Sequence, residues 1–538
     1  MSKTDKQSNA GNFILILVAM VLGVLIGLMF SSPKRQSAEP MSLEGKVGEV
    51  MKLLEKAYVD EIDSDSISER LLPVILSEMD PHSSYLSARE TERTDEMMRG
   101  NFEGVGLMLH REGDTTFVGQ VIAAGPSAGV GILPGDMIVN VDGEPVSGVG
   151  MPADSVVARL RGPRGTKVTV DVLREGNMAM SFTIRRGVVP RKTLTYSAML
   201  DDTTGYIVLS SFANTSHDEF RTALMQLKRR GMRHLVFDLR GNSGGSLQSA
   251  VGIAGELLPS GSLIVYTQGA HSRRSNQLSL PGGSFTKGGV TVMVDEGSAS
   301  ASEVVSGALQ DNDRAVIVGR RTFGKGLVQR EFALDDGSSV LLTTARYYTP
   351  SGRCIQRSYN DGTDEYYRDY FNQLIDEVYS DSMQFAIRDS TPYYTVGGRT
   401  VYGGGGIVPD YPLAYHKDSS LIYYNQLSSN GLISRVAFGY VKMHAAVLLS
   451  KYPDPERFRN GFSVGDMLVD KLVAEGEKAG VKRNPASLRR QRHLVESMLK
   501  AHIGMALFGE QGFYDAFINQ DEDLQQVLKM LRQKKLKL

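Results

Sequence analysis

Residues 291–303 read Thr291-Val-Met-Val-Asp-Glu-Gly-Ser-Ala-Ser300-Ala-Ser-Glu303, an apolar run that stops at small residues and is followed by a different periodicity. The β-branched residues at its start predict a strand, and the apolar spacing from Glu303 to Leu309 predicts a helix. Ser300 therefore lies at a strand-to-helix turn, which exposes its hydroxyl. Further strands and helices alternate on both sides of this turn, and that order predicts an α/β core.

A second apolar run, 315–318, ends at Gly319 and leads into Arg321-Thr-Phe-Gly-Lys325-Gly-Leu-Val-Gln329. Lys325 is therefore expected on a loop beyond a neighbouring strand end, where its side chain can meet that of Ser300. A lysine can take the proton of a serine only when it is neutral, which desolvation or a nearby cation favours. Gln329 could hold the amine without adding a negative charge. Taken alone, the same residues also fit a helix cap beside a solvated lysine.

Acyl transfer needs hydrogen-bond donors for the developing oxyanion, and one well-placed donor is worth about 3 kcal/mol. The backbone amide of Ala301, directly after the serine, is one candidate. Another lies in Leu235-Val-Phe-Asp-Leu-Arg-Gly-Asn-Ser-Gly-Gly245, a strand of buried type that ends in a glycine turn. By itself this segment is equally an ordinary turn at a strand end.

Together these three segments resemble the signature of the carboxy-terminal processing peptidases, the tail-specific Ser/Lys proteases of family S41. The resemblance implies a crotonase-like α/β core with a mixed sheet, and a Ser/Lys pair is an accepted variant of the catalytic triad. It implies that Ser300 is the nucleophile, that Lys325 is the base and that Gln329 orients the base. It also implies that Gly245 lies in the oxyanion hole beside the Ala301 amide, with Gly244 the second choice to Gly245.

Residues 101–189 are similar to a PDZ domain, with Phe102-Glu-Gly-Val-Gly-Leu107 at the start and Leu133-Pro-Gly-Asp136 further on. Backbone amides of the loop can face a ligand carboxylate, and the adjoining strand edge can pair with an extended peptide. The unit is therefore expected to capture C-terminal tails, although a small β domain with a tight turn is the alternative. The expected peptide-binding residues are Gly104, Val105, Gly106 and Leu107.

Two further residues have weaker interpretations. His82, in Asp80-Pro-His-Ser-Ser-Tyr-Leu86, is the alternative base of a serine-histidine mechanism, but no carboxylate-supported histidine motif accompanies it. Its segment is more typical of a helix end that Pro81 terminates. Arg161 is a candidate for communication between the PDZ unit and the site, because the family resemblance implies such gating, but a surface arginine in a turn is the more common meaning.

The uncharged stretch Phe13 to Phe30 is flanked by basic residues on both sides and predicts a membrane segment. An uncleaved anchor is favoured over a signal peptide, because the run is long and ends in Leu28-Met29-Phe30 without a small-residue cleavage site. The flanking charges do not determine orientation. The family resemblance implies a single-pass protein of the inner membrane with its catalytic body in the periplasm, or otherwise outside the cytoplasm.

These patterns divide the chain into six parts. The insertion within the peptidase core is rich in tyrosine and suits helical packing or a lid. For the C-terminal region, dimerisation through helices is the default expectation. The parts are a tail (1–12), an anchor (13–30), a linker with N-terminal helices (31–100), the PDZ unit (101–189), the peptidase core (190–413, insertion at about 353–403) and a helical C-terminal region (414–538).

The composition excludes several classes of protein. A single cysteine, Cys354, rules out an intramolecular disulfide and a cysteine-ligated zinc site. The formal net charge of −1 gives no reason to expect nucleic acid as a partner. No metal or organic cofactor site is visible. The expected partners are protein or peptide substrates with accessible C-termini and the membrane, and a homo-oligomer or an activating adaptor remains open.

Two other functions stay in contention. A non-catalytic PDZ adaptor that binds client C-termini would explain the PDZ unit, but it has no need of Ser300, Lys325 and Gln329 together. An acyl-CoA hydrolase or isomerase on the same kind of core would use backbone oxyanion donors, but it needs neither a Ser/Lys pair nor a peptide-binding domain. The sequence therefore favours a serine endopeptidase that acts through an acyl-enzyme.

Overall fold

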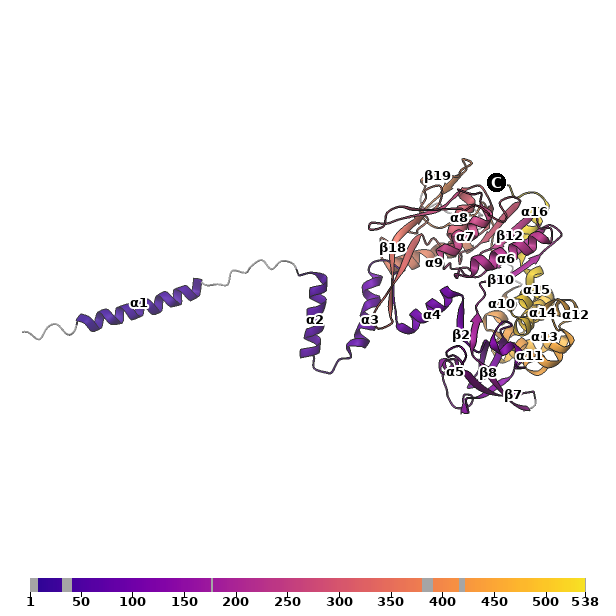
Figure 1. Ribbon diagram of the computed structural model, residues 1–538, viewed down its shortest axis with the longest axis horizontal. Helices are drawn as coiled ribbons and strands as arrows, with labels where there is room; N and C mark the ends of the chain where they lie inside the picture. The colour runs from indigo at the N-terminus through magenta and orange to yellow at the C-terminus, as the bar shows by residue number, and fades with distance from the viewer. Residues whose placement is uncertain (1–7, 31–40, 176–177, 380–389, 416–420, 538) are drawn as a thin grey trace, which may run out of the picture. The chain divides into compact units, whose positions relative to one another are not determined.

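The computed structural model describes residues 8–30, 41–175, 178–379, 390–415 and 421–537 (Figure 1). The chain divides into two units, Met1–Leu71 and Leu72–Leu538. Residues 1–7 of the expected tail, the expected linker at 31–40 and residues 380–389 of the expected insertion lie outside the described residues.

The first unit is helical. Its helices are α1 (Ser8–Phe30), α2 (Leu43–Ala57) and the start of α3 (Ser64–Ser77), which crosses the division between the units. Ser42 caps α2 by accepting a hydrogen bond from the Gly45 amide at 3.1 Å, which satisfies one of the free N–H groups of the first turn. The apolar side chains of α1 between Leu15 and Ile26 are exposed.

The second unit begins with an antiparallel β domain. Helix α4 (Ala88–Arg99) leads into it, and a two-stranded ribbon of β2 (Asn101–Gly104) and β9 (Gly187–Pro190) closes it. In the main sheet, β3 forms one edge. The remaining elements are β3 (Leu107–Glu112), β4 (Thr115–Val121), η1 (Pro126–Gly129), β5 (Met137–Val141), β6 (Glu144–Pro145), α5 (Ala153–Leu160), β7 (Lys167–Arg174) and β8 (Met178–Arg185).

The core of the unit is a six-stranded mixed sheet in the order β10-β11-β12-β15-β16-β21, parallel from β11 onward with β10 antiparallel to β11. Helices α6 (Ser216–Arg229), α7 (Leu247–Leu257) and α8 (Ala301–Asp311) cover one face (Figure 1). The strands are β10 (Leu194–Met199), β11 (Thr204–Leu209), β12 (His234–Asp238), β15 (Gly289–Val294), β16 (Val316–Gly319) and β21 (Tyr411–Pro412).

Both faces of this sheet are buried, because side chains alternate along each strand. Along β11, Ile207 and Leu209 face the cluster formed with α6, α7 and α8, whereas Tyr206 and Val208 face a second cluster. The second cluster is completed by Leu524 and other residues of the C-terminal region. A parallel sheet covered on both sides is the arrangement expected of an α/β core.

An antiparallel sheet lies beside the core sheet. Its central strand is long: one edge of β18 (Ser339–Tyr348) pairs with β17 (Leu327–Ala333), and β1 (Ser84–Leu86) and β13 (Leu263–Gln268) pair with its two ends. Strand β14 (Ser275–Leu278) extends β13. Residues near β1 are thereby placed next to β17, although about 250 residues of chain separate them. The insertion contributes α9 (Thr363–Tyr379), β19 (Pro392–Tyr394) and β20 (Thr400–Tyr402).

The C-terminal region is helical, as expected. Within the described residues one helix, α11, is long and apolar enough to cross a membrane, with a mean hydropathy of 1.4, but its apolar residues belong to the core of this region. The helices are α10 (Ile422–Ser429), α11 (Leu432–Lys451), α12 (Pro455–Gly461), α13 (Asp466–Lys478), α14 (Pro485–Phe508), α15 (Glu510–Phe517), η3 (Ile518–Gln520) and α16 (Glu522–Arg532).

Candidate active site

Ser300 is the N-cap residue of α8, at the turn that follows β15. Its backbone has φ 53° and ψ −111°, a conformation that residues other than glycine rarely adopt. The surrounding contacts hold this strained turn, since the Ser300 amide donates to Glu303 Oε2 at 2.9 Å. The strand-to-helix turn predicted from the sequence is therefore present, and it is sharper than an ordinary helix start.

Glu303 ties the Ser300 turn to the loop that carries Lys325. Its fully buried carboxylate accepts hydrogen bonds from Thr322 Oγ1 at 2.5 Å and from the backbone amides of Gly324 at 2.8 Å and Lys325 at 2.9 Å, besides that of Ser300. Burial raises the pKa of Glu303 to about 7, although these donors favour the charged form. Sequence reasoning gave Glu303 no role, yet its position three residues after the N-cap is the capping-box spacing.

The Lys325 amine is held by Gln329, whose Oε1 accepts its hydrogen bond at 2.6 Å. Gln329 in turn donates through Nε2 to the carbonyl oxygen of His82. Burial lowers the pKa of Lys325 below its ordinary value, and the charges of Asp80 and Glu303 oppose this effect. The amine is therefore partly desolvated, the condition that a general base of this type requires.

The structure brings the serine and the lysine onto adjoining loops but does not join their functional groups. Within the described residues, no hydrogen bond connects the Ser300 hydroxyl with the Lys325 amine, which donates to Gln329 instead. The two backbones are fixed by a common partner: the buried Tyr347 hydroxyl lies 2.6 Å from Lys325 O and 3.1 Å from Ser300 O. Burial raises the pKa of Tyr347 well above its usual value, so the phenol stays protonated and can donate.

Two glycines end the loop after β12, and Gly244 lies against the Ser300 turn whereas Gly245 lies against Phe212. A Cβ on Gly244 would lie 2.8 Å from Ser300 Cβ, and one on Gly245, where φ is 133°, would lie 2.1 Å from Phe212 O. The Gly244 amide donates to Asn242 Oδ1 at 2.9 Å and is thus engaged. In the part of the chain that the structure describes, the amides of Gly245 and Ala301 donate to no other group. These two N–H groups are consequently available to a ligand oxygen.

His82 lies next to the site, and its ring contacts Tyr366. Its Nε2 is 3.0 Å from the Tyr366 hydroxyl, and its carbonyl oxygen is the acceptor for Gln329. Burial, followed by the charge of Lys325, lowers the pKa of His82 to about 4. The imidazole is therefore neutral near pH 7. Its main-chain oxygen, rather than its ring, contacts the residues expected to act in catalysis.

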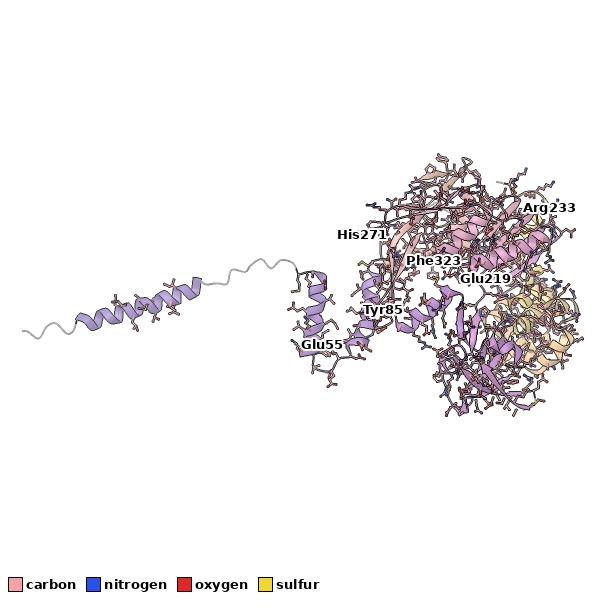
Figure 2. The ribbon with its side chains drawn as sticks, viewed as in Figure 1. Glu55, Tyr85, Glu219, Arg233, His271 and Phe323 are labelled. Atoms are coloured by element: carbon pink, nitrogen blue, oxygen red, sulfur yellow. The ribbon has the colours of Figure 1, made fainter. Side chains whose placement is uncertain are left out.

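Helix α9 of the insertion packs on the same loops. The Tyr370 ring lies 4.9 Å from that of Phe323, which precedes Lys325 by two residues and is labelled in Figure 2. The Tyr370 hydroxyl donates to Glu296 O at 3.1 Å, on the segment before Ser300. The expectation of helical packing or a lid is consistent with these contacts. No signal in the sequence assigned Tyr366 or Tyr370 to the site.

In the PDZ-like domain, the loop between β2 and β3 carries the expected peptide-binding residues. Among the described residues, the amides of Val105 and Gly106 donate to no other group, and Val105 O accepts from Ser127. Leu107 begins β3, an edge strand of the main sheet, and no strand of the described residues pairs with the outer edge of β3, where an extended peptide could add. Arg161 pairs with Glu96 on α4 at 2.6 Å, and its guanidinium lies 5.0 Å from the centre of the Phe102 ring on β2.

No group of three or more histidine, cysteine, aspartate or glutamate side chains is arranged for a metal within the described ranges.

Comparison with known proteins places these features in a family. Residues 203–364 match peptidase family S41, residues 117–174 match the PDZ domain, and residues 423–509 match a family of unknown function. The chain is 32% identical to the probable CtpA-like serine protease of Staphylococcus aureus strain COL over 370 residues, which is 66% of this chain and 74% of that protein. The chain belongs to the carboxy-terminal processing proteases of peptidase family S41.

A second relative supports this assignment, and one solved structure is also similar to part of the chain. The carboxy-terminal-processing protease of Bartonella bacilliformis is 33% identical over 317 residues, 58% of this chain and 72% of that protein. The solved photosystem II D1 C-terminal processing protease is 25% identical, covers 68% of this protease and 85% of its own chain, and has a TM-score of 0.35. The predicted family and the predicted serine-type peptidase activity are thus confirmed, and the protease combines a PDZ domain, mixed sheets and a helical C-terminal region.

Proposed function

We propose that this protease is a membrane-anchored serine endopeptidase that captures C-terminal tails through its PDZ domain and cleaves through a Ser300–Lys325 dyad and an acyl-enzyme. The observation that supports the dyad most is the shared scaffold of its two members. One buried carboxylate, Glu303, accepts from the backbone of both loops, and the Tyr347 hydroxyl lies against a carbonyl of each. Such preorganisation is what positioned acid–base catalysis requires.

In the proposed reaction the neutral Lys325 amine takes the proton of the Ser300 hydroxyl as Oγ attacks the scissile carbonyl carbon. The oxyanion that forms faces the amides of Gly245 and Ala301, each worth about 3 kcal/mol of transition-state stabilisation. The resulting ammonium gives its proton to the leaving amine, and the C–N bond breaks to leave an acyl-enzyme. Water then attacks the acyl carbon as the amine takes its proton, and the ammonium returns that proton to Ser300 Oγ as the ester C–O bond breaks, which releases the new carboxyl end and restores both groups.

The amine has to approach the serine for this reaction. It now donates to Gln329, and proton transfer requires roughly 3 Å between Nζ and Oγ. Because hydrogen bonds fix the backbone on both sides, rotation of the lysine side chain is the smallest change that makes this contact. Gln329 can keep one hydrogen bond to the amine throughout and so limits where the amine can go.

Tail capture is proposed for the loop of Gly104, Val105, Gly106 and Leu107. The free amides of Val105 and Gly106 are suited to a terminal carboxylate, and the β3 edge is suited to the residues before it. A PDZ adaptor without catalysis is not favoured. The chain belongs to a peptidase family, and an adaptor would have no use for the Ser300 and Lys325 loops.

Anchoring is proposed for α1. Its apolar stretch Leu15–Ile26 is exposed and belongs to the uncharged run that ends at Phe30. We place the helix in the inner membrane and the catalytic body in the periplasm. Extraction of membranes with alkaline carbonate should leave the full chain in the pellet and release residues 42–538. Equal release of both would remove the anchor from the proposal.

The dyad is tested with an unstructured polypeptide and mass spectrometry of its new ends. Ser300→Ala and Lys325→Ala should each lower turnover by at least about a thousandfold, while tail binding stays intact. Ser260→Ala and Lys287→Ala, two exposed positions on the same core, serve as matched controls and should cleave normally. Undiminished turnover in Ser300→Ala or Lys325→Ala would remove the dyad assignment.

The capture step is tested separately by amidating the C-terminus of the same polypeptide. A substrate without a terminal carboxylate should be cleaved more slowly at low concentration, because the PDZ loop loses its charged partner. Equal rates for free and amidated substrates would contradict PDZ capture and leave the dyad untouched.

A further inference from the structure

The first turn of the C-terminal helix α16 carries two carboxylates that bind arginines of the protease core. Asp521, its N-cap residue, accepts from both terminal nitrogens of Arg240 at 2.5 and 3.1 Å. Asp523 accepts from both terminal nitrogens of Arg320 at 2.8 and 3.2 Å. Two-point contacts of this kind fix direction as well as distance.

The two arginines stand at the beginning of the two loops that matter for catalysis. Arg240 follows β12 and precedes Gly245 by five residues, whereas Arg320 follows β16 and precedes Lys325 by five residues. One helix terminus therefore contacts the stem of the loop with a proposed oxyanion donor and the stem of the loop with the proposed base. These loops are far apart in the sequence, and they follow the two strands on either side of β15, the strand that leads into the Ser300 turn.

The two ion pairs are largely buried, so removing one partner would leave the other as an unpaired buried charge. Arg320 and Asp523 are buried, and Arg240 is half-buried and also bonds the buried Asp238, which accepts from the Tyr206 hydroxyl at 2.6 Å. A buried charge that loses its partner is strongly destabilised. Each arginine would consequently move toward another acceptor or toward solvent, and its loop stem would move with it.

The apolar side of α16 packs against the core sheet. Leu524, Val527 and Leu528 pack in the cluster that covers the second face of the core sheet. These apolar contacts hold α16 against the sheet, whereas Asp521 and Asp523 bind the arginines at the two loop stems. Docking and loop control are therefore separable by mutation.

We infer that α16 is a positioning element of the active site, in which Asp521 and Asp523 hold the oxyanion loop and the lysine loop in mutual register through Arg240 and Arg320. The inference rests on the catalytic roles proposed for Gly245 and Lys325. Neither aspartate touches the substrate in this arrangement. Both are positioning residues, and the C-terminal region is part of the catalytic apparatus and not an appended domain.

The test uses the full chain with Asp521→Asn, Asp523→Asn and the double variant. We expect kcat to fall at least about tenfold in each single variant and further in the double variant, since misplacement of a catalytic group by about 1 Å can cost a hundredfold. KM for a tail-bearing polypeptide should stay close to the wild-type value, because capture belongs to the PDZ domain. Asp470→Asn, which removes an exposed carboxylate from α13, is the matched control and should leave kcat unchanged.

Two further readouts separate positioning from loss of the fold. Hydrogen exchange should increase in residues 239–245 and 320–326 while α6 keeps its protection, and Asp521→Glu should recover most of kcat because a longer carboxylate can still reach Arg240. Unchanged kcat in the double variant overturns the inference, and so does increased exchange throughout the core sheet. If the dyad itself were wrong, Ser300→Ala would remain active, a result that does not depend on α16.

Discussion

The ε-amino group of Lys325 is surrounded by three titratable groups, those of Asp80, Glu303 and His82. Burial lowers the pKa of the Lys325 amine, while the negative charges of Asp80 and Glu303 raise it. The lysine can act as a base only in its neutral form, so activity should be lost as pH falls through its pKa. His82 is already neutral in that range, because its pKa is lowered to about 4.

Asp80→Asn should move the acid limb of the kcat/KM profile to lower pH. Removing the negative charge takes away a contribution that raises the Lys325 pKa, and the amine is then neutral at lower pH. The asparagine oxygen can still accept from the His82 and Ser83 amides, so the local fold should persist. Initial rates across pH for the wild type and the variant measure the effect. An unmoved limb, or one at higher pH, would mean that another group titrates.

At this scale the sequence proposes site residues within contiguous motifs but does not indicate which distant residues contact them. Ser300, Lys325 and Gln329 are proposed because their loops carry a recognisable pattern, and in the structure the Lys325 amine donates to Gln329. Asp80 and His82 lie more than 200 residues earlier, and only the pairing of β1 with β18 brings them close. No local periodicity reports a contact of that range.

At the scale of elements, Glu303 joins the start of α8 to the loop after β16 through four hydrogen bonds. Glu303→Gln should lower the free energy of unfolding by about 1–3 kcal/mol, because an amide offers one acceptor oxygen and leaves a buried donor unsatisfied. It should also lower kcat, since both catalytic loops lose their common anchor. Urea denaturation and steady-state kinetics measure the two effects.

The matched control for this change is Glu256→Gln, a buried carboxylate of α7 that accepts from the Ser284 amide far from the dyad. It should lose stability but keep its kcat. The pH dependence has a defined sign, because burial raises the Glu303 pKa from 4.5 to about 7. As pH rises, the unfolded chain releases this proton before the folded chain does. The free energy of unfolding of the wild type, relative to that of Glu303→Gln, should therefore fall as pH rises from about 4.5 to about 7. A constant difference across that window would show that Glu303 keeps one protonation state.

Element boundaries near the site followed from periodicity, and the architecture around them did not. The predicted strand at 291–294 and helix from Glu303 correspond to β15 and α8. The residues from Tyr370 to Tyr379 have helical spacing in the sequence and belong to α9, but the packing of α9 on Phe323 depends on long-range aromatic contacts. The segment Phe508 to Tyr514, which suggests a turn between helices, contains the α14–α15 junction at Gly509 and otherwise continues as helix.

On the scale of the whole molecule, the C-terminal helices connect the PDZ domain to the protease core. On the PDZ side, Lys442 of α11 pairs with Glu112 at 2.8 Å and its ammonium lies 4.3 Å from the centre of the Phe117 ring. The His110 ring lies 4.1 Å from that of Phe438. Helix α14 also packs against β4 of the PDZ domain. The sequence assigned no role to this region, because the contacts of α11 join segments about 330 residues apart.

The closeness of this docking depends on Gly135, in the turn before β5. Its φ is +93°, and a Cβ there would lie 2.5 Å from Lys442 Cα, a backbone atom that cannot rotate away. Gly135→Ala should therefore push the PDZ domain off α11. Gly131 is a matched control, because its φ is +92° and a Cβ would meet only Phe182 at 3.6 Å. Both changes carry a similar strain of about 1–2 kcal/mol, and only the first creates a clash.

Scanning calorimetry of the region from residue 42 onward should distinguish the two variants. Gly131→Ala should lower the melting temperature by a few degrees and keep the unfolding of the PDZ domain coupled to that of the helices. Gly135→Ala should split off an earlier transition, since a PDZ domain without its interface unfolds on its own. The same variant should bind a free tail peptide normally but turn over a tethered substrate more slowly, because a captured tail is no longer held at a fixed distance from Ser300. A single transition in Gly135→Ala, at the temperature of Gly131→Ala, would mean that the interface contributes nothing to the way the domains unfold.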